Sequence, residues 1–274
     1  MFHLLGVATL SLLVISSVAS PFARPQGDTY DVQAARQPSD TPPRYPAQPT
    51  PARATVYSKC RQSNTVALTF DDGPGIYEPE LLDTLAKYNA KATFFLNGNN
   101  YRCIYNQQQV DIVRRIYNAG HQIGSHTWSH PHLNDLSWQE TLIRIVGVNP
   151  LLFRPPFGEY NDNVLSALKA RNQSAVLWDF DNGDSVGASP AQSNKLYDEV
   201  ARRHPSNLLA LNHSVYNSTV RIVAPHALAV LSKQKYRFVT VSECLGLSQK
   251  YQSTKQPEQR TVSRRCRQFN FGSR

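Results

Sequence analysis

The chain has 274 residues, of which 41% are hydrophobic and 18% are charged. That length suffices for one sizeable core and excludes two full-sized domains. The formal charge of +9 would suit a nucleic-acid-binding protein. Much of that charge lies near the C-terminus, however, and no nucleic-acid-binding motif accompanies it. We therefore expect one folded domain and no nucleic acid partner.

The chain begins with an apolar stretch. Residues 2–18 are almost wholly apolar and lead into small residues that end at Ser20, as in a secretory signal peptide cleaved near Ala19. A membrane anchor is the alternative, but a span needs about 20 apolar residues and no stop-transfer charges follow. The polar C-terminus also lacks the hydrophobic tail of a glycolipid anchor. We expect residues 1–19 to be a signal peptide of a secreted, extracellular or cell-wall protein without a membrane anchor.

Segments of biased composition flank the expected domain. Residues 21–51 hold eight of the 18 prolines, so residues 20–58 are expected to be a disordered linker. The catalytic domain is expected at 59–248 and a basic, solvated or wall-associating tail at 249–274. That tail contains one acidic residue, Glu258, and seven basic residues: Lys250, Lys255, Arg260, Arg264, Arg265, Arg267 and Arg274.

Between these segments, short apolar runs alternate with stretches of helical period. Strands are predicted at 66–70, 92–96, 122–124, 175–178, 208–211 and 238–241. Helices are predicted at 79–88, 109–119, 163–170, 190–203 and around 221–232, the last interrupted by Pro225. Such βα repeats predict a buried parallel sheet, either closed into a barrel or open and doubly wound.

In both architectures functional residues gather where the strands end. Five polar residues follow predicted strands directly or closely: Asp71, Asp72, His126, Asp181 and His213. We therefore expect these side chains to converge on one face of the sheet.

The chain has four cysteines. In an oxidising compartment they are disulfide candidates, and the absence of a CxxC spacing makes a cysteine zinc site improbable. Cys60 precedes the first predicted strand and Cys244 follows the last, so we expect a disulfide that ties the chain ends together. The pairing of Cys103 with Cys266 then follows by elimination.

The sequence TFDDGP places Asp71 and Asp72 at a strand end before a glycine and a proline. Neighbouring residues that leave a strand point in different directions, so one carboxylate can bind a metal while the other faces a substrate. The alternative is a plain turn, because Asp, Gly and Pro are common turn residues.

His126 and His130, in HTWSH, have a spacing that brings two imidazoles to one side of a helical turn. Two histidines and one carboxylate form a common catalytic zinc set, although an isolated pair of this spacing is more often structural. His132 follows Pro131 and is expected to leave the site.

Two further motifs offer catalytic groups. In RPPFG, Arg154 can hold a carboxylate and the loop amides can face a developing oxyanion. In LNH, His213 ends a strand and can exchange protons near neutral pH. An arginine loop or a strand-end histidine is more often structural when it stands alone. The catalytic interpretation of Arg154 and His213 therefore depends on the other motifs in the chain.

In order, TFDDGP, HTWSH, RPPFG, WDFDNGD and LNH resemble the five motifs of the NodB-homology polysaccharide deacetylases, and the sequence between them resembles secreted fungal chitin deacetylases. The resemblance covers residues 66–245 and implies an α/β fold with a single deformed (β/α) barrel. It also implies roles by matching position. Asp72, His126 and His130 would bind the metal, with Asp71 as general base and His213 as general acid. Arg154 would hold the base in position, and Asp184, with Asp181 nearby, would tune the proton affinity of the acid histidine. The backbone amide of Phe157 would bind the oxyanion, and Leu211 would line the pocket for the acetyl methyl group.

The implied reaction is the metal-dependent hydrolysis of N-acetyl groups in chitin or its oligosaccharides, which yields chitosan and acetate. The enzyme would be a monomeric chitin deacetylase, a hydrolase of linear amide bonds other than peptide bonds. The cofactor would be Zn²⁺, with Co²⁺ or another divalent metal as the alternative. Other readings are a deacetylase of peptidoglycan or acetylxylan, or an impaired protein that binds cell-wall polysaccharide.

The chain departs from the family pattern at several positions. Ser185 stands where an aromatic residue is usual, Ser214 where Asp is common, and Phe157 where Tyr is usual. The family's long helix between Leu136 and Arg154 is reduced to a possible helix at 137–146. We expect this shortening to weaken folding more than it alters the chemistry.

Three N-glycosylation sequons begin at Asn172, Asn212 and Asn217. The sequon at Asn212 overlaps the expected active site, and we expect it to be unused.

Overall fold

The computed structural model describes residues 52–132, 148–257 and 266. The expected signal peptide, most of the expected linker and the possible helix at 137–146 lie outside these ranges. Within the described part of the chain, no helix has the length and apolarity needed to cross a membrane.

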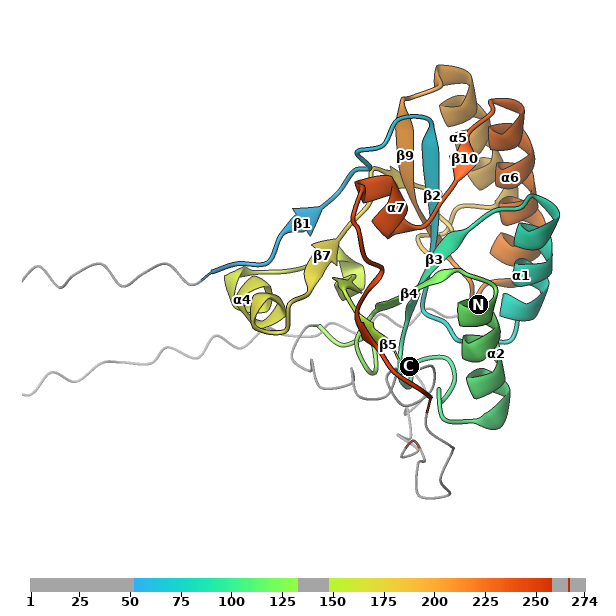
Figure 1. Ribbon diagram of the computed structural model, residues 1–274. Helices are drawn as coiled ribbons and strands as arrows, with labels where there is room; N and C mark the ends of the chain where they lie inside the picture. Colours follow the sequence, from blue (N-terminus) through green and yellow to red (C-terminus); the bar gives the residue numbers. More distant parts are fainter. Residues whose placement is uncertain (1–51, 133–147, 258–265, 267–274) are drawn as a thin grey trace, which may run out of the picture. The chain divides into compact units, whose positions relative to one another are not determined.

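A curled, parallel sheet of nine strands forms the centre of the fold (Figure 1). Its path runs β1-β7-β6-β4-β3-β2-β9-β8, and β10 pairs with β2 beside this path. The strands span Val56–Tyr57 (β1), Thr65–Asp71 (β2), Ala92–Leu96 (β3), Gln122–Ser125 (β4), Leu152–Phe153 (β6), Ser174–Val176 (β7), Phe180–Asp181 (β8), Asn207–His213 (β9) and Arg237–Phe238 (β10). The sheet and its helices form a half-barrel, which confirms the deformed barrel implied by the resemblance.

The central strands are buried on both faces. Every residue of β2, β3 and β9 is buried, as expected for a parallel sheet that is covered on both sides. One face contributes Phe70 and Phe94, whose rings stack with centroids 5.5 Å apart, to the main core. The other contributes Ala67, Phe95 and Leu209 to a second core that includes the disulfide Cys60–Cys244.

Helices cover the first of these faces (Figure 1). These helices span Glu78–Lys87 (α1), Gln107–Asn118 (α2), Pro190–Arg203 (α5) and Ala224–Lys233 (α6). Helix Val241–Leu245 (α7) packs in the second core, and helix Asp162–Ala170 (α4) packs in a third cluster. Helix α5 begins where the sequence predicts because Ser189 forms a capping box with Gln192 and Pro190 occupies the first turn.

Two predicted elements differ from the structure. Pro225 does not interrupt a helix, because it lies in the first turn of α6, where its missing N–H is not needed. A π-helical turn, Thr219–Val223 (η2), precedes it. The strand predicted at 238–241 ends at Phe238, because Thr240 caps α7 through a capping box with Glu243.

The folded unit extends past both ends of the expected catalytic range. Strand β1 pairs with β7, and Ala54 packs in a third core cluster. Beyond residue 248, strand β11 (Tyr251–Thr254) pairs antiparallel with β5 (Val148–Pro150). The sequence did not predict these short strands, because strands of two to four residues carry no measurable periodicity.

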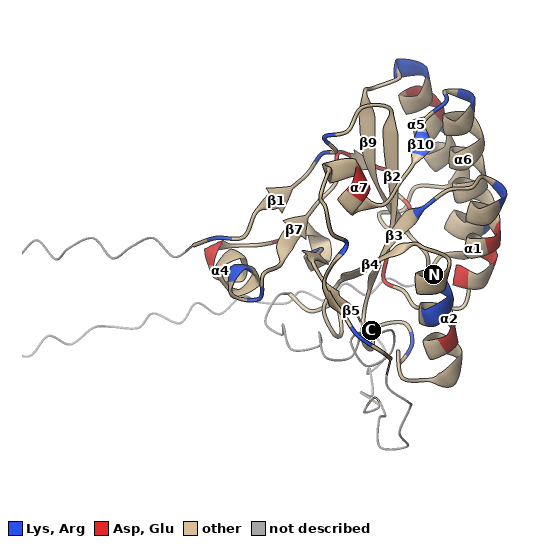
Figure 2. Cartoon of the chain, viewed as in Figure 1, with Lys and Arg blue, Asp and Glu red and all other residues tan. Residues whose placement is uncertain are grey.

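Both expected disulfides are present. Cys60–Cys244 joins the segment before β2 to α7, and Cys103–Cys266 joins the loop after β3 to the C-terminal segment. In the described part of the chain, basic residues are spread over several helices and loops rather than forming one stripe (Figure 2).

Candidate active site

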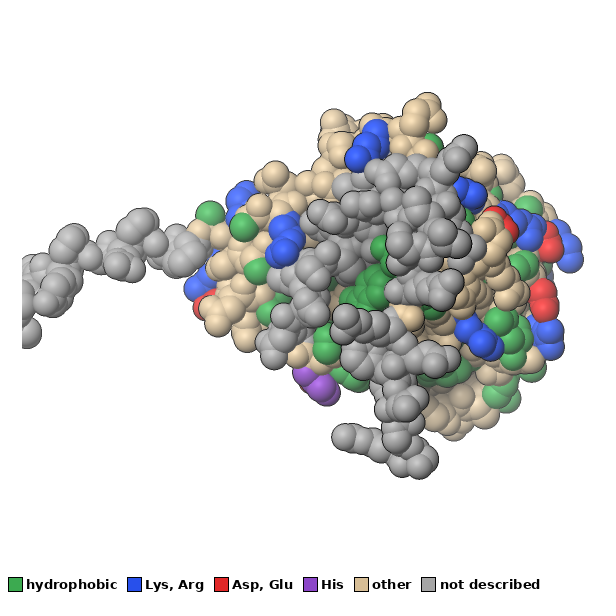
Figure 3. Space-filling view, turned by 90° about the horizontal axis from the view of Figure 1, so that it is seen from below, with side chains coloured by type: hydrophobic (Ala, Val, Ile, Leu, Met, Phe, Trp, Pro, Cys, Tyr) green, Lys and Arg blue, Asp and Glu red, His purple; other side chains and the backbone are tan. Residues whose placement is uncertain are grey.

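The carboxyl ends of β2, β4 and β9 meet at one edge of the sheet, and a cleft of about 580 Å³ opens there. In Figure 3, hydrophobic side chains gather near the middle of the face seen from below, and a histidine is exposed beside them. Sixteen residues line the cleft: Asp71, Asp72, Asn100, Tyr101, His126, His130, Pro155, Phe157, Gly158, Trp178, Asp181, Ser185, Val186, Leu211, His213 and Tyr216. The prediction that the polar residues converge is therefore confirmed.

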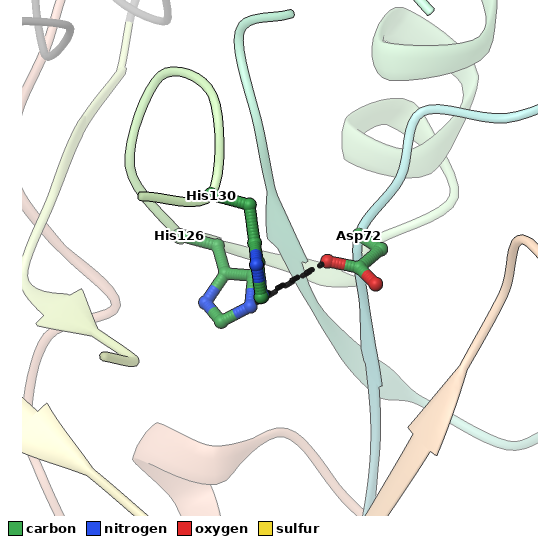
Figure 4. Close-up of side chains that lie close together, drawn as sticks. All are labelled: Asp72, His126 and His130. Carbon is green, nitrogen blue, oxygen red and sulfur yellow. Dashed lines mark ion pairs between the residues drawn. The ribbon is translucent and has the colours of Figure 1, made fainter. Parts of the chain in front are cut away.

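Asp72, His126 and His130 form a compact group of potential metal ligands (Figure 4). The Oδ1 atom of Asp72 lies 3.7 Å from Nε2 of His126 and 3.5 Å from Nε2 of His130. One ligand atom from each residue lies within 4.8 Å of the others. Two imidazole nitrogens and one carboxylate oxygen match the protein ligands of a catalytic zinc site, which keeps a fourth position open.

The two histidines are prepared to act as neutral ligands. Nδ1–H of His126 donates to the Arg154 carbonyl at 2.7 Å, which leaves Nε2 with a free lone pair. Burial lowers the pKa of both His126 and His130, so burial favours the neutral imidazole. The neutral imidazoles of His126 and His130, together with the Asp72 carboxylate, therefore suit a divalent metal.

The ligand loops adopt unusual backbone conformations. Asp72, Thr127 and His130 have φ values of 72°, 71° and 56°, in the left-handed region that non-glycine residues rarely adopt. The Thr127 hydroxyl accepts the His130 N–H at 3.1 Å and supports this turn. Such strain is typical of functional sites, where the surrounding fold holds the backbone in place.

Asp71 lies beside the metal ligands but is held by another residue. Its Oδ1 atom accepts a hydrogen bond from Nη1 of Arg154 at 2.9 Å, and its Oδ2 atom lies 3.7 Å from Nε2 of His126. The side chain of Asp71 is almost completely buried. One oxygen is thus fixed by a cation, while the other faces the cleft next to the ligand group.

Arg154 is fully buried, and its guanidinium uses several donors. Nε donates to the Val176 carbonyl at 3.1 Å and Nη2 to the Leu177 carbonyl at 2.8 Å. Nη1 also donates to the Thr69 hydroxyl at 2.5 Å, and the guanidinium carbon lies 4.2 Å from the centre of the Phe95 ring. The planar guanidinium of Arg can reach all of these acceptors at once, whereas the single ammonium group of Lys could not.

Asp184 holds His213, another residue of the cleft, through two hydrogen bonds. Oδ1 of Asp184 accepts from Nδ1 of His213 at 2.7 Å, and Oδ2 accepts the His213 backbone N–H at 2.8 Å. Burial alone would lower the pKa of His213, but the hydrogen bond and the charge of Asp184, together with the nearby carboxylates, raise it to about 9. The imidazole therefore carries a proton at neutral pH and can act as an acid.

Phe157 and its loop form one wall of the cleft. The Phe157 φ angle of 59° belongs to a short 3₁₀ turn, Pro156–Gly158 (η1), and its N–H finds no acceptor among the described residues. Its ring is more than half exposed and lies between the rings of His130 and His132, with centroids 4.6 and 4.5 Å away. His132 was expected to leave the site, yet it stacks on this wall.

The remaining expected residues also line the cleft. Leu211 is buried at its base, while Asp181 and Ser185 are exposed at its rim. Asn212, which starts one sequon, is 1% exposed and donates through Nδ2 to the Thr69 carbonyl at 3.1 Å. A glycan at Asn212 would require this buried amide to leave the sheet.

Several cleft residues were missed by the sequence analysis. Asn100 donates to Asp72 Oδ1 at 3.2 Å, and the hydroxyls of Tyr101 and Tyr216 lie 3.4 Å apart in the wall near His213. Trp178 lies across the cleft, where it packs on Gly158. Asn100 and Tyr101 lie in a loop without a recognisable motif. Trp178 is the first residue of the WDFDNGD motif and Tyr216 lies three residues after His213, so both could have been proposed from those motifs.

The fold and the site together define a class. A half-barrel carries, at the carboxyl ends of its strands, a metal-ligand group flanked by an Arg-held carboxylate and an Asp-held histidine. This arrangement is that of a metal-dependent hydrolase with separate basic and acidic groups.

Comparison with known proteins specifies the family. The profile of the polysaccharide deacetylase family matches residues 58–176. A chitin deacetylase of Colletotrichum lindemuthianum is 32% identical over 258 residues, which cover 89% of this chain and 94% of the relative. A peptidoglycan-N-acetylglucosamine deacetylase of Bacillus cereus is 36% identical, with 66% of this chain and 87% of the relative covered. The solved structure of the chitin deacetylase from C. lindemuthianum superposes with a TM-score of 0.67 at 32% identity, covering 72% of this chain and 94% of that one. The chain belongs to the polysaccharide deacetylase family.

Proposed function

We propose that this protein hydrolyses the N-acetyl groups of N-acetylglucosamine residues in chitin, giving chitosan and acetate. The observation that carries the proposal is the placement of Asp71 and His213 in one cleft with the Asp72, His126 and His130 group. The similarity to a chitin deacetylase over 89% of this chain supports the choice of polymer.

Zinc is the proposed metal, with Co²⁺ or another divalent ion as the alternative, because two neutral imidazoles and one carboxylate are a common zinc donor set. When bound, such an ion supplies Lewis acidity that polarises an acetamide carbonyl and favours ionisation of water.

The protein's own groups then account for the proton transfers. Asp71 accepts the proton of the attacking water, and Arg154 keeps the orientation of its carboxylate fixed. The Phe157 N–H, which has no acceptor in the described part of the chain, is the donor for the negative charge that develops on the acetamide oxygen. His213, protonated through its contact with Asp184, gives its proton to the departing amine. Leu211 supplies an apolar wall for the acetyl methyl group.

Peptidoglycan is the second candidate polymer. The observation that favours it is the B. cereus relative, a peptidoglycan-N-acetylglucosamine deacetylase that is 36% identical to this chain. Both polymers present the same N-acetylglucosamine unit, so the site chemistry described above serves either one. The loops around the cleft decide between them.

We further propose that the protein is secreted, acts as a monomer and carries N-linked glycans at Asn172 and Asn217. The two disulfides support secretion, because they persist in oxidising compartments. Asn172 and Asn217 are both exposed, which a glycan acceptor requires.

Acetate release from chitin oligosaccharides tests the proposal. The purified wild type should release acetate, a chelator should abolish the release, and added Zn²⁺ should restore it. Asp71→Asn should lower kcat by roughly 10²–10⁴-fold through the loss of the general base. Asp83→Asn, which changes an exposed ion pair with Arg115, is the matched control and should behave as wild type. Activity that persists in chelator would refute the metal mechanism, and activity on peptidoglycan alone would assign the second polymer.

A further inference from the structure

Glu78, the first residue of α1, is a buried carboxylate that the mechanism above does not use. Its side chain has 0% exposure, and burial raises its pKa. No basic side chain among the described residues pairs with it. Instead, both carboxylate oxygens accept the Gly75 N–H at 2.8 Å, and Oε1 accepts the Ser214 hydroxyl at 2.8 Å. A buried, unpaired carboxylate is costly, so its retention requires an explanation.

One partner of Glu78 is the loop that carries the metal-ligand aspartate. A Cβ atom added to Gly73 would lie only 2.4 Å from Oε1 of Glu78, so the carboxylate lies directly against this loop. The Gly73 carbonyl accepts the Asn97 N–H at 2.7 Å on the other side. The loop is thus held between Glu78 and Asn97 directly after Asp72, whose φ of 72° lies in the left-handed region.

The other partner of Glu78 adjoins the acid histidine. Ser214 follows His213, and its N–H and its hydroxyl both lie 3.4 Å from the Asp71 carbonyl. The Ser214 hydroxyl donates to Glu78 at 2.8 Å. One carboxylate on α1 therefore connects the end of β2, which carries the base, to the end of β9, which carries the acid.

We propose that Glu78 is a positioning residue that holds the Asp71–Asp72 loop and His213 in the relative placement needed for metal binding and proton transfer. Glu78 and Ser214 form a pair in which either member could supply the carboxylate. In this chain the acidic member lies on α1, and Ser214, just after the end of β9, donates the hydrogen bond. The predicted effect on kcat rests on the proposed function. The predicted effect on metal affinity does not, because zinc binding to Asp72, His126 and His130 can be measured without substrate.

Exchange of the two side chains tests the pair. Glu78→Ser removes the carboxylate and should weaken zinc binding to the metal-free protein by roughly 10–100-fold, as measured by calorimetry. It should lower kcat on chitin oligomers more than it changes KM. Ser214→Asp alone places a second carboxylate beside Glu78 and should also weaken zinc binding. The double variant Glu78→Ser with Ser214→Asp restores a single carboxylate and should return zinc affinity and kcat to within about threefold of wild type.

Two further variants keep the test decisive. Ser214→Ala removes one hydrogen bond and leaves the carboxylate in place, so it supplies a folded variant if Glu78→Ser does not fold; it should weaken zinc binding measurably. Glu80→Ser makes the same substitution at an exposed position of α1 and should change neither zinc affinity nor kcat.

Zinc affinity equal to wild type in both Glu78→Ser and Ser214→Ala, with only a lower thermal midpoint, would reduce Glu78 to a structural residue and overturn the proposal. A double variant no better than its worse parent would also overturn it. If wild type binds zinc but releases no acetate from any polymer, the proposed function fails while the zinc measurements still decide the inference.

Discussion

Asp184 holds His213 at two points: Oδ1 accepts from Nδ1 at 2.7 Å, and Oδ2 accepts from the backbone N–H at 2.8 Å. The Thr219 hydroxyl donates to Oδ2 at 2.7 Å and fixes the carboxylate. The contact therefore sets both the orientation of the imidazole and its charge. It also sets the upper limit of the pH range in which the proposed reaction can proceed.

The first prediction concerns that limit. His213 has a pKa raised to about 9, so it is protonated below that pH and loses its proton as the pH rises through 9. In Asp184→Asn the amide oxygen still accepts from Nδ1, but the negative charge is gone. The pKa of His213 should fall toward its ordinary value of roughly 6.5. The basic limb of the kcat profile for acetate release should move down by about 2 pH units, and kcat at pH 8 should fall at least tenfold.

Asp198→Asn is the matched control, because the exposed Asp198 pairs with a half-buried histidine, His226, at 2.7 Å outside the cleft. Its kcat profile should match that of wild type. A basic limb that stays near pH 9 in Asp184→Asn would show that His213 is not the acid.

The sequence predicted the site well for a physical reason. Parallel strands end at one edge of the sheet, so residues at or just after the ends of β2, β4 and β9 had to meet, and Asp71, His126 and His213 do. Long elements with a strong signal were also predicted correctly, such as helix α5, which has a capping box and a proline in its first turn.

What the sequence did not predict depends on contacts between distant residues. In the sequence, Glu78 is typical of the acidic residues in the first turn of an ordinary helix. Only the fold shows that its carboxylate accepts a hydrogen bond from Ser214, 136 positions away. Tyr101 and Tyr216 are 115 positions apart, and neither belongs to a periodic pattern. Val241 was assigned to a strand because it is β-branched and apolar, but the Thr240 cap makes it helical.

The second prediction concerns the fold's dependence on Arg154. Its guanidinium satisfies the carbonyls of Val176 and Leu177 and the carboxylate of Asp71, all in the interior. Arg154→Met fills much of the space but leaves Asp71 as an unpaired buried charge. The free energy of unfolding in urea should fall by about 3–5 kcal/mol, the usual cost of removing one member of a buried ion pair.

Arg221→Met provides the comparison, because Arg221 forms an ion pair with Glu80 at the surface. This variant should unfold at the same urea concentration as wild type. Equal midpoints for Arg154→Met and wild type would contradict the central role given to Arg154. Arg154→Lys should resemble Arg154→Met rather than wild type, because an ammonium group cannot reproduce the planar fork.

The third prediction concerns the rim of the cleft. Ser185 is exposed there and presents only a small polar side chain to the cleft. Ser185→Trp should supply a flat apolar surface for a sugar ring, which contributes about 0.5–1.5 kcal/mol to binding. We expect KM for chitin oligomers to fall by about two- to tenfold with kcat unchanged. Ser185→Ala should leave KM as it is. An unchanged or higher KM in Ser185→Trp would indicate that no sugar ring binds beside this position.

The fourth prediction separates the two disulfides. Cys60–Cys244 lies in the core and closes a loop of 184 residues, so Cys60→Ala with Cys244→Ala should lower the free energy of unfolding by about 2–5 kcal/mol and leave KM unchanged. Cys103 lies in the same loop as Asn100, the partner of Asp72. Cys103→Ala with Cys266→Ala should therefore raise KM and weaken zinc binding as well as lower stability. Urea unfolding, zinc calorimetry and acetate kinetics on both double variants provide the measurements. Identical KM and zinc affinity in the Cys103 variant and wild type would show that this loop keeps its shape without the disulfide.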